Sequence, residues 1–199
     1  MATGMQEKGD TYLSISAESR GLYKESGSRF LAFAYPVVTE EEAKEHIAAL
    51  RKEYFDARHH CFAWRLGCDG ARWRANDDGE PSSTAGKPIY GQLLSSSLSD
   101  ILIVVVRYFG GTKLGVPGLI RAYRSAAADA IANATIIEKV ATETFVLSFD
   151  YIETNNVMKR LKEMGLSPLS QRFDTRCTLS VAVPLGRIAT FREALGWAL

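Results

Sequence analysis

Three acidic side chains, Asp77, Asp78 and Glu80, lie close together in the polar stretch from Asn76 to Pro88, here called the acidic loop. Carboxylate oxygens at such spacings are suitable ligands for a hard divalent cation. The stretch contains almost no large apolar side chain, so we expect an exposed loop, in which an Asx-turn with solvated acids is the simpler alternative. We favour that alternative and assign no metal ligand. The candidate residues of the acidic loop are Asp77, Asp78, Glu80, Ser82, Thr84 and Lys87.

A second candidate segment, from Arg107 to Arg124, is rich in glycine and in basic residues. It follows the aliphatic run Ile101 to Val106 and leads into the alanine-rich run Leu119 to Ala132, which indicates a junction between a buried strand and a helix. Such a junction presents free backbone N–H groups and the positive end of a helix dipole to an anion. The predicted anion- or nucleic-acid-binding residues are Arg107, Gly110, Gly111, Lys113, Gly115, Gly118, Arg121 and Arg124.

The distribution of charge supports this interpretation. Between Pro81 and Ala128 there are five basic residues and one acid, a local excess of +4 in a chain whose formal net charge is +1. A nucleic-acid site must therefore be a local patch, because the whole chain is not a polycation. The alternative is that the glycines form tight turns and the arginines pair with carboxylates of the acidic loop.

Nucleotide-cofactor and catalytic motifs are absent from the sequence. The glycines match neither the P-loop nor the G-x-G-x-x-G pattern, so ATP and NAD sites are disfavoured and no cofactor is predicted. Ser82, Ser83 or Thr84 could pair with a histidine as a nucleophile and base, but the G-x-S-x-G elbow is missing. No catalytic residue is assigned, and a binding protein is favoured over an enzyme.

His59, His60, Cys61 and Cys68 are of the residue types that bind zinc. Adjacent histidines on a strand point to opposite faces, and the cysteine spacing is wrong for a paired site. We therefore predict no metal site and treat His59 and His60 as residues that orient the acidic loop.

Four aromatic residues are candidates for stacking on bases, since aromatic side chains bind single strands in this way. We expect most of them to be core residues and Tyr108 to be the exception. These residues are Trp64, Trp73, Tyr108 and Phe109.

Hydrophobic periodicity predicts the elements that position these residues. Ile101 to Val106 is expected to be a central strand buried on both faces. Thr39 followed by Glu42 has the spacing of a capping box and predicts the start of a helix, and Pro117 is well placed to open a second helix. Gly21 to Ser28 is expected to be a polar turn region. The other expected elements are strands at 11–16, 29–35, 61–66 and 71–74 and helices following 39 and at 119–132.

From Thr142 onwards the pattern changes to a strand at 144–151, a helix at 153–164, strands at 169–173 and 177–183, and a helix at 186–195. This order is a βαββα unit, which is most of a ferredoxin-like fold. We therefore predict an α+β protein with two domains, residues 1–138 and 139–199, although no Pro/Gly/Ser-rich linker marks the join.

The composition is that of a globular protein, with 46% hydrophobic and 24% charged residues in 199. Three cysteines, an odd number, argue against a secreted disulfide framework. No apolar run reaches the ~18 residues that a membrane span needs. We expect a cytoplasmic protein with no membrane association, and the sequence leaves its oligomeric state open.

The motifs DDGEPSSTAGKP and VVVRYFGGTKLGVPGLIRAY closely resemble the paired signature of the YigZ/IMPACT family, and ARHHCFAW and SRFLAF also match its pattern in the family's order. The resemblance implies a first domain similar to domain IV of elongation factor G and a ferredoxin-like second domain similar to its domain V. Eukaryotic members act in translational control by binding a regulator of a stress kinase. Bacterial members have been suggested to bind RNA or the ribosome.

The leading hypothesis is a translation-linked protein that binds RNA, the ribosome or a protein partner through the basic, glycine-rich segment. The competing hypothesis is an enzyme that acts on a phosphorylated small molecule and holds a divalent metal with the acidic loop. A deep pocket joining the two segments would favour the enzyme, whereas a flat basic face would count against it.

Overall fold

The computed structural model describes residues 10–174 and 176–199, which form two compact units. The first unit contains residues 12–139. The second contains 140–199 together with Asp10 and Thr11. Asp10 is held there by two hydrogen bonds, because its backbone oxygen accepts from the Ala141 amide at 2.5 Å and its carboxylate accepts from the Gly186 amide at 2.5 Å.

The first unit is built on a five-stranded antiparallel sheet in the order β2-β3-β6-β4-β5. All six residues from Ile101 to Val106 are buried, which confirms the predicted central strand. The strands of this sheet are β2 (Ser19–Glu25), β3 (Ser28–Pro36), β4 (His59–Leu66), β5 (Arg72–Asn76) and β6 (Ile101–Tyr108). Two further strands, β1 (Thr11–Ile15) and β7 (Ile136–Val140), pair with each other.

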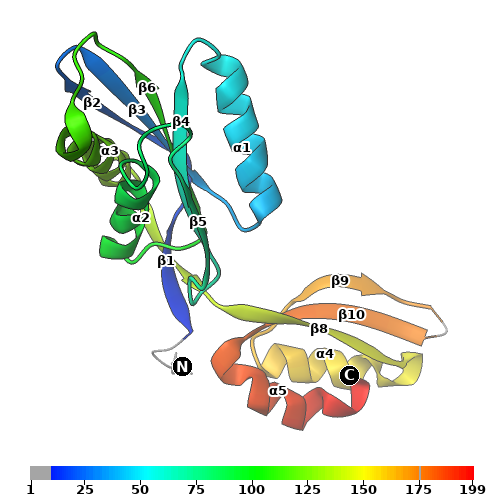
Figure 1. Ribbon diagram of the computed structural model, residues 1–199. Coiled ribbons are helices and arrows are strands. Elements are labelled where there is room, and N and C mark those ends of the chain that lie inside the picture. The colour runs from blue at the N-terminus through cyan, green and yellow to red at the C-terminus, as the bar shows by residue number, and fades with distance from the viewer. Residues whose placement is uncertain (1–9, 175) are drawn as a thin grey trace. The chain divides into compact units, whose positions relative to one another are not determined.

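Helices cover both faces of this sheet (Figure 1). Helix α1 (Glu40–Glu53) packs on one face, and α2 (Gly86–Ser95) and α3 (Gly115–Ala132) pack on the other. The predicted cap of α1 is confirmed, since the Glu42 amide donates to Thr39 Oγ1 at 3.1 Å. Helix α3 starts at Gly115, so Pro117 lies within its first turn, where proline is tolerated.

Two local predictions were wrong. The expected turn region Gly21 to Ser28 is instead strand β2 followed by a tight turn at Ser26 and Gly27, both of which have positive φ. Gly21 signals a turn in the sequence, but the structure uses it for close packing. A Cβ added there would lie 2.3 Å from the Ala130 backbone nitrogen of α3. Its lack of a side chain therefore lets the helix approach the strand.

Helix α2 was not predicted, and the acidic loop is less exposed than expected. Thr84, Gly86 and Pro88 are buried, and the last three positions of the loop already belong to α2. Glycine and proline in this segment obscure the helical pattern, yet Pro88 sits in the first turn, where its missing N–H leaves no hydrogen bond unmade.

The second unit has the predicted βαββα order, with a three-stranded antiparallel sheet in the order β8-β10-β9. Helices α4 and α5 share one core with it, which includes Leu147, Val157 and Phe191. The elements are β8 (Thr142–Asp150), α4 (Thr154–Glu163), β9 (Pro168–Arg172), β10 (Arg176–Pro184) and α5 (Ile188–Leu195), with short 3₁₀ turns at Tyr151–Glu153, Leu185–Arg187 and Gly196–Ala198. Within the residues described, none of the helices is both long and apolar enough to cross a membrane.

The packing of Gly21 predicts opposite effects for two glycine substitutions. Gly21→Ala should lower the free energy of unfolding by roughly 1–3 kcal/mol, because the new methyl group overpacks against α3. Gly91→Ala should raise it by about 0.5–1 kcal/mol, since Gly91 lies inside α2 with open space around it. Urea unfolding of both variants measures the two changes. Equal stability of the two variants would contradict this role of Gly21.

Candidate functional site

The acidic loop and the segment that leads into α3 line one cavity of about 790 Å³. This volume lies within the range of ~300–1,000 Å³ that is usual for small-molecule sites. The cavity joins the two segments that the sequence singled out, an arrangement that favours the enzymatic hypothesis. Its lining residues are Arg58, His59, Glu80, Pro81, Arg107, Phe109, Lys113, Leu114, Gly115, Val116 and Leu119.

A buried ion pair lies between the acidic loop and the central strand. Arg107 Nη1 donates to Glu80 Oε1 at 2.6 Å, and the two side chains are only 8% and 4% exposed. The Arg107 guanidinium also lies 5.5 Å from the ring centre of Phe30 and 5.7 Å from that of Phe109. Arg107 is therefore neutralised by Glu80, as the alternative interpretation of the arginines suggested.

Tyr123 of α3 joins this pair, since its hydroxyl donates to Glu80 Oε1 at 2.7 Å. Cys61 Sγ lies 3.3 Å from the same hydroxyl and 3.0 Å from the Asp77 carbonyl oxygen. Burial raises the pKa of both the Tyr123 phenol and the Cys61 thiol, so both groups stay protonated at neutral pH and act as donors. Sequence reasoning did not select Tyr123, although it is the last residue of the motif VVVRYFGGTKLGVPGLIRAY. It lies 43 residues from Glu80, and nothing in the motif indicates that pairing.

Asp77 organises the acidic loop and caps α2. One oxygen of its carboxylate accepts from the Ser83 amide at 2.8 Å, and the other accepts from the Ala85 and Gly86 amides at 3.0 and 2.8 Å. The residue directly before α2 provides no side-chain cap, so Asp77 satisfies the free N–H groups at this helix end. Thr84 braces the same turn by donating to the Pro81 carbonyl at 2.6 Å, and Ser82 is exposed.

Asp78 ties the acidic loop to α1 and to β4. Its carboxylate accepts from Arg51 Nη2 at 2.6 Å and from the His60 backbone amide at 2.6 Å. Its backbone oxygen lies 2.9 Å from His59 Nδ1. Burial is the main cause that lowers the pKa of His60, with the nearby Arg51 adding to it. Both histidines thus contact the same residue of the loop.

All three carboxylates of the acidic loop therefore accept hydrogen bonds from protein donors. Across the residues that the structure describes, no three His, Cys, Asp or Glu side chains group in a way that could hold a metal ion. A cavity that favours the enzymatic hypothesis is present, but these carboxylates already accept hydrogen bonds from the protein itself.

The remaining basic residues divide into paired and unpaired groups. Arg121 forms an ion pair with Glu25. Lys87, Lys113 and Arg124 are exposed, and none of them forms an ion pair with an acid of the described chain.

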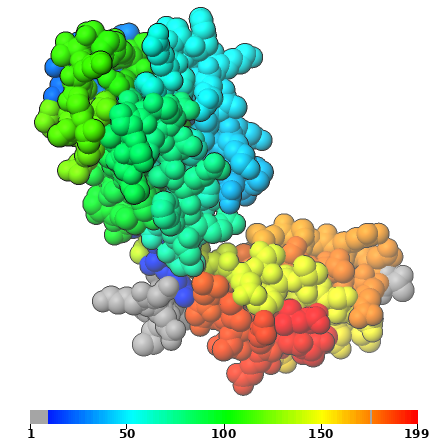
Figure 2. All heavy atoms as spheres, viewed as in Figure 1, coloured from blue at the N-terminus to red at the C-terminus, as the bar shows by residue number. Residues whose placement is uncertain are grey.

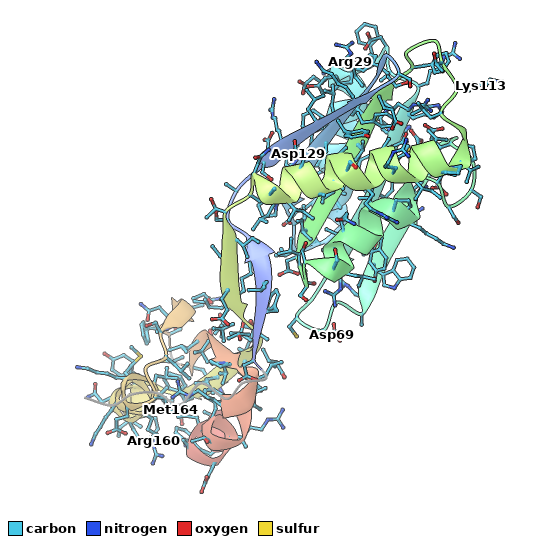
Figure 3. All side chains as sticks on the ribbon, turned by 90° about the vertical axis from the view of Figure 1, so that its left-hand side faces the viewer. Arg29, Asp69, Lys113, Asp129, Arg160 and Met164 are labelled. Carbon is cyan, nitrogen blue, oxygen red and sulfur yellow. The ribbon has the colours of Figure 1, made fainter. Side chains whose placement is uncertain are left out.

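Lys87 and Arg124 flank a second depression of about 420 Å³, which Ser83 also lines. Figure 2 shows the green atoms of α2 at the surface of the first unit. In Figure 3, Lys113 lies in the loop before α3, at the opposite end of the unit from Asp69.

Arg58 lines the larger cavity. The sequence interpretation did not select it, although it lies within the motif ARHHCFAW.

The glycines of the basic segment have different structural roles. Gly110 passes the turn between β2 and β3 so closely that an added Cβ would lie 1.9 Å from the Gly27 carbonyl carbon. Its amide donates to Ser28 Oγ at 3.1 Å, so Gly110 serves chain packing. Gly111 and Gly115 have positive φ and no close packing neighbours, whereas Gly118 is buried against Leu114.

The aromatic candidates are not arranged as expected. Tyr108 is partly buried and its hydroxyl donates to Asp56 at 2.7 Å, and Trp64 is buried. The more exposed rings are Phe109, at 59%, and Trp73, at 50%. Trp73 stacks on Tyr90 with 4.4 Å between ring centres.

The fold and the site define an α+β protein of two units, with a cavity that joins an acidic loop to a basic helix start. The Impact N-terminal domain family model matches residues 26–131. The Escherichia coli protein IMPACT family member YigZ is 34% identical over 170 residues, which cover 84% of this chain and 83% of that protein. The chain therefore belongs to the IMPACT family.

Two further matches extend this comparison. The Saccharomyces cerevisiae Protein IMPACT homolog is 32% identical over 113 residues, which cover 54% of this chain and 43% of that protein. A crystal structure of a hypothetical protein is 32% identical in sequence and has a TM-score of 0.75. The match covers 94% of this chain and 92% of the chain in that structure, so the similarity includes both units.

The buried ion pair predicts a large loss of stability when its acid is neutralised. Glu80→Gln should lower the free energy of unfolding by roughly 3–5 kcal/mol, because the Arg107 charge is left buried without a partner. Glu25→Gln, which removes the charge opposite the exposed Arg121, should cost far less. Urea unfolding at one pH compares the two variants. If both lose the same stability, the ion pair does not have the role described.

The lowered pKa of His60 predicts that the stability of the protein depends on pH. Because burial lowers the pKa of His60, the unfolded chain takes up this proton at a higher pH than the folded chain does. Stability is therefore lost as the pH falls below about 6.5, the usual pKa of histidine. His60→Gln should lose less stability than the wild type between about pH 7.5 and 5.5. Urea unfolding at both pH values measures this difference. If the wild type and His60→Gln lose the same stability, His60 does not contribute to the pH dependence.

Proposed function

We propose that this chain is a cytoplasmic, translation-linked protein whose first unit binds the phosphate backbone of RNA, free or in the ribosome. The observation that carries the proposal is the set of exposed cations around the two depressions, Lys113, Lys87 and Arg124, which pair with no acid in the described residues. Cations in this state can exchange their counterions for phosphates.

Electrostatics supports the choice of these residues. Arg107 and Arg121 are paired with Glu80 and Glu25, so they add little net charge to the surface. The positive charge available to a ligand comes instead from Lys87, Lys113 and Arg124, with Arg58 at the larger cavity. The carboxylates of the acidic loop are turned inward and do not cancel it.

The start of α3 adds a second source of attraction. No side chain caps this helix at Leu114, and Gly115 and Val116 of its first turn line the larger cavity. Free amides and the positive end of the helix dipole favour an anion there. Pro117 has no N–H, so Lys113 is expected to contribute more than the backbone does.

The link to translation rests on the family resemblance of the paired motifs. A ribosome offers the same phosphates as free RNA, so one basic surface suits both. The cytoplasmic placement rests on the cysteines, since Cys61, Cys68 and Cys177 are all free thiols.

A second candidate, an enzyme acting on a phosphorylated small molecule, is favoured by the cavity that joins the two segments. Its metal-binding part has less support, because Asp77, Asp78 and Glu80 already accept hydrogen bonds from the protein. Binding of RNA uses the cations that remain available and requires no carboxylate.

The proposal predicts the salt dependence of RNA binding. Lys113→Ala combined with Arg124→Ala should weaken binding of a single-stranded RNA at low salt. The slope of log affinity against log salt should fall by roughly 0.7 for each phosphate that the variant no longer neutralises. Filter binding at several salt concentrations measures both effects.

A charge-matched control is Lys44→Ala combined with Lys52→Ala on α1, which covers the other face of the sheet. This variant should bind RNA like the wild type. If both double variants weaken binding equally, binding depends on the total charge of the chain and not on this surface. Absence of RNA affinity at low salt would refute the proposal.

A further inference from the structure

The larger cavity is lined by both apolar and positively charged side chains. The apolar ones are Phe109, Leu114, Val116 and Leu119, and the exposed cations are Arg58 and Lys113. Glu80 is the one acid among the described residues that line it, and Arg107 neutralises that acid. A ligand that matches this lining has an apolar, flat part and a negatively charged part.

We propose that this cavity binds a single unstacked nucleotide, with the base against Phe109 and the phosphate at Lys113. The inference rests on the proposed binding of RNA and specifies how the cavity takes part in it. Single-stranded RNA is commonly recognised through bases that leave the stack and pack on aromatic side chains.

Phe109 is arranged as a stacking surface. Phe109 is 59% exposed as a residue, although it directly follows the central strand β6. The Arg107 guanidinium lies 5.7 Å from its ring centre and is itself fixed by the ion pair with Glu80. This cation–π contact favours the position of the ring beside the cavity, and a pre-positioned ring loses less freedom on binding.

The phosphate end of the nucleotide is placed by charge. Lys113 and the first-turn residues Gly115 and Val116 lie together on the cavity. These donors favour a phosphate over a neutral apolar group, which distinguishes a nucleotide from the apolar side chain of a protein partner.

The ligand class can be tested with nucleoside 5′-monophosphates. Titration of the full ¹⁵N-labelled chain with AMP or UMP should shift the amide signals of Lys113, Leu114 and Val116 in a saturable way. Inorganic phosphate and the uncharged nucleosides should each bind at least about tenfold more weakly, since each carries only half of the recognised chemistry.

Variants separate the two halves of the site. Phe109→Ala should weaken nucleotide binding about tenfold, in line with the stacking of a base on an aromatic ring, and leave phosphate binding unchanged. Lys113→Ala should weaken the binding of both the nucleotide and inorganic phosphate. Phe173→Ala, which removes a partly exposed phenylalanine of the second unit, is the matched control and should change neither.

The outcomes distinguish this inference from the proposed function. RNA binding that persists without any nucleotide binding, or that is unaffected by Phe109→Ala, overturns the inference and leaves the proposed function intact. Nucleotide binding at these amides without RNA affinity sinks the proposed function and retains the nucleotide site. Phosphate binding as tightly as AMP, or displacement of AMP by an apolar peptide, also overturns the inference.

Discussion

The ion pair between Arg107 and Glu80 joins three parts of the first unit that are distant in sequence. Arg107 comes from the central strand, Glu80 from the acidic loop, and Tyr123 from α3, and all three meet at one carboxylate oxygen. Because both charges are removed from water, neither can be left without the other. The loop, the helix start and the cavity between them therefore depend on this contact.

This arrangement turns the acids inward and leaves cations at the surface. Asp77 caps α2 and Asp78 binds Arg51 and the His60 amide, so the acidic loop stabilises the fold with its charge. Lys87, Lys113 and Arg124 have no such partners in the described chain. A chain with almost no net charge can thus present a positive surface where the two candidate segments meet.

Much of the fold could be predicted from the sequence because local patterns determine it. Six consecutive aliphatic residues identify β6, Thr39 marks the start of α1, and the periodicity of the second unit predicts its βαββα order. Strands β2 and β7 and helix α2 were missed. Gly21 of β2 and Pro88 of α2 resemble turn signals but serve packing and a first helical turn, and β7 lies where the domain boundary was expected. The two segments that line the cavity could be identified from their motifs, but Tyr123 and Arg58 were not selected. The pairing of side chains between the segments could not be predicted, since Glu80 meets Arg107 across 27 residues and Tyr123 across 43.

RNA is proposed to bind to the surface formed by the acidic loop, α2 and the start of α3. The most direct measurement is a titration of ¹⁵N-labelled protein with a short single-stranded RNA, followed through the backbone amide signals. If RNA binds there, the shifts should cluster at Phe109 to Val116, Lys87 and Arg124, with little change in α1. Shifts confined to α1 or to the second unit would contradict it.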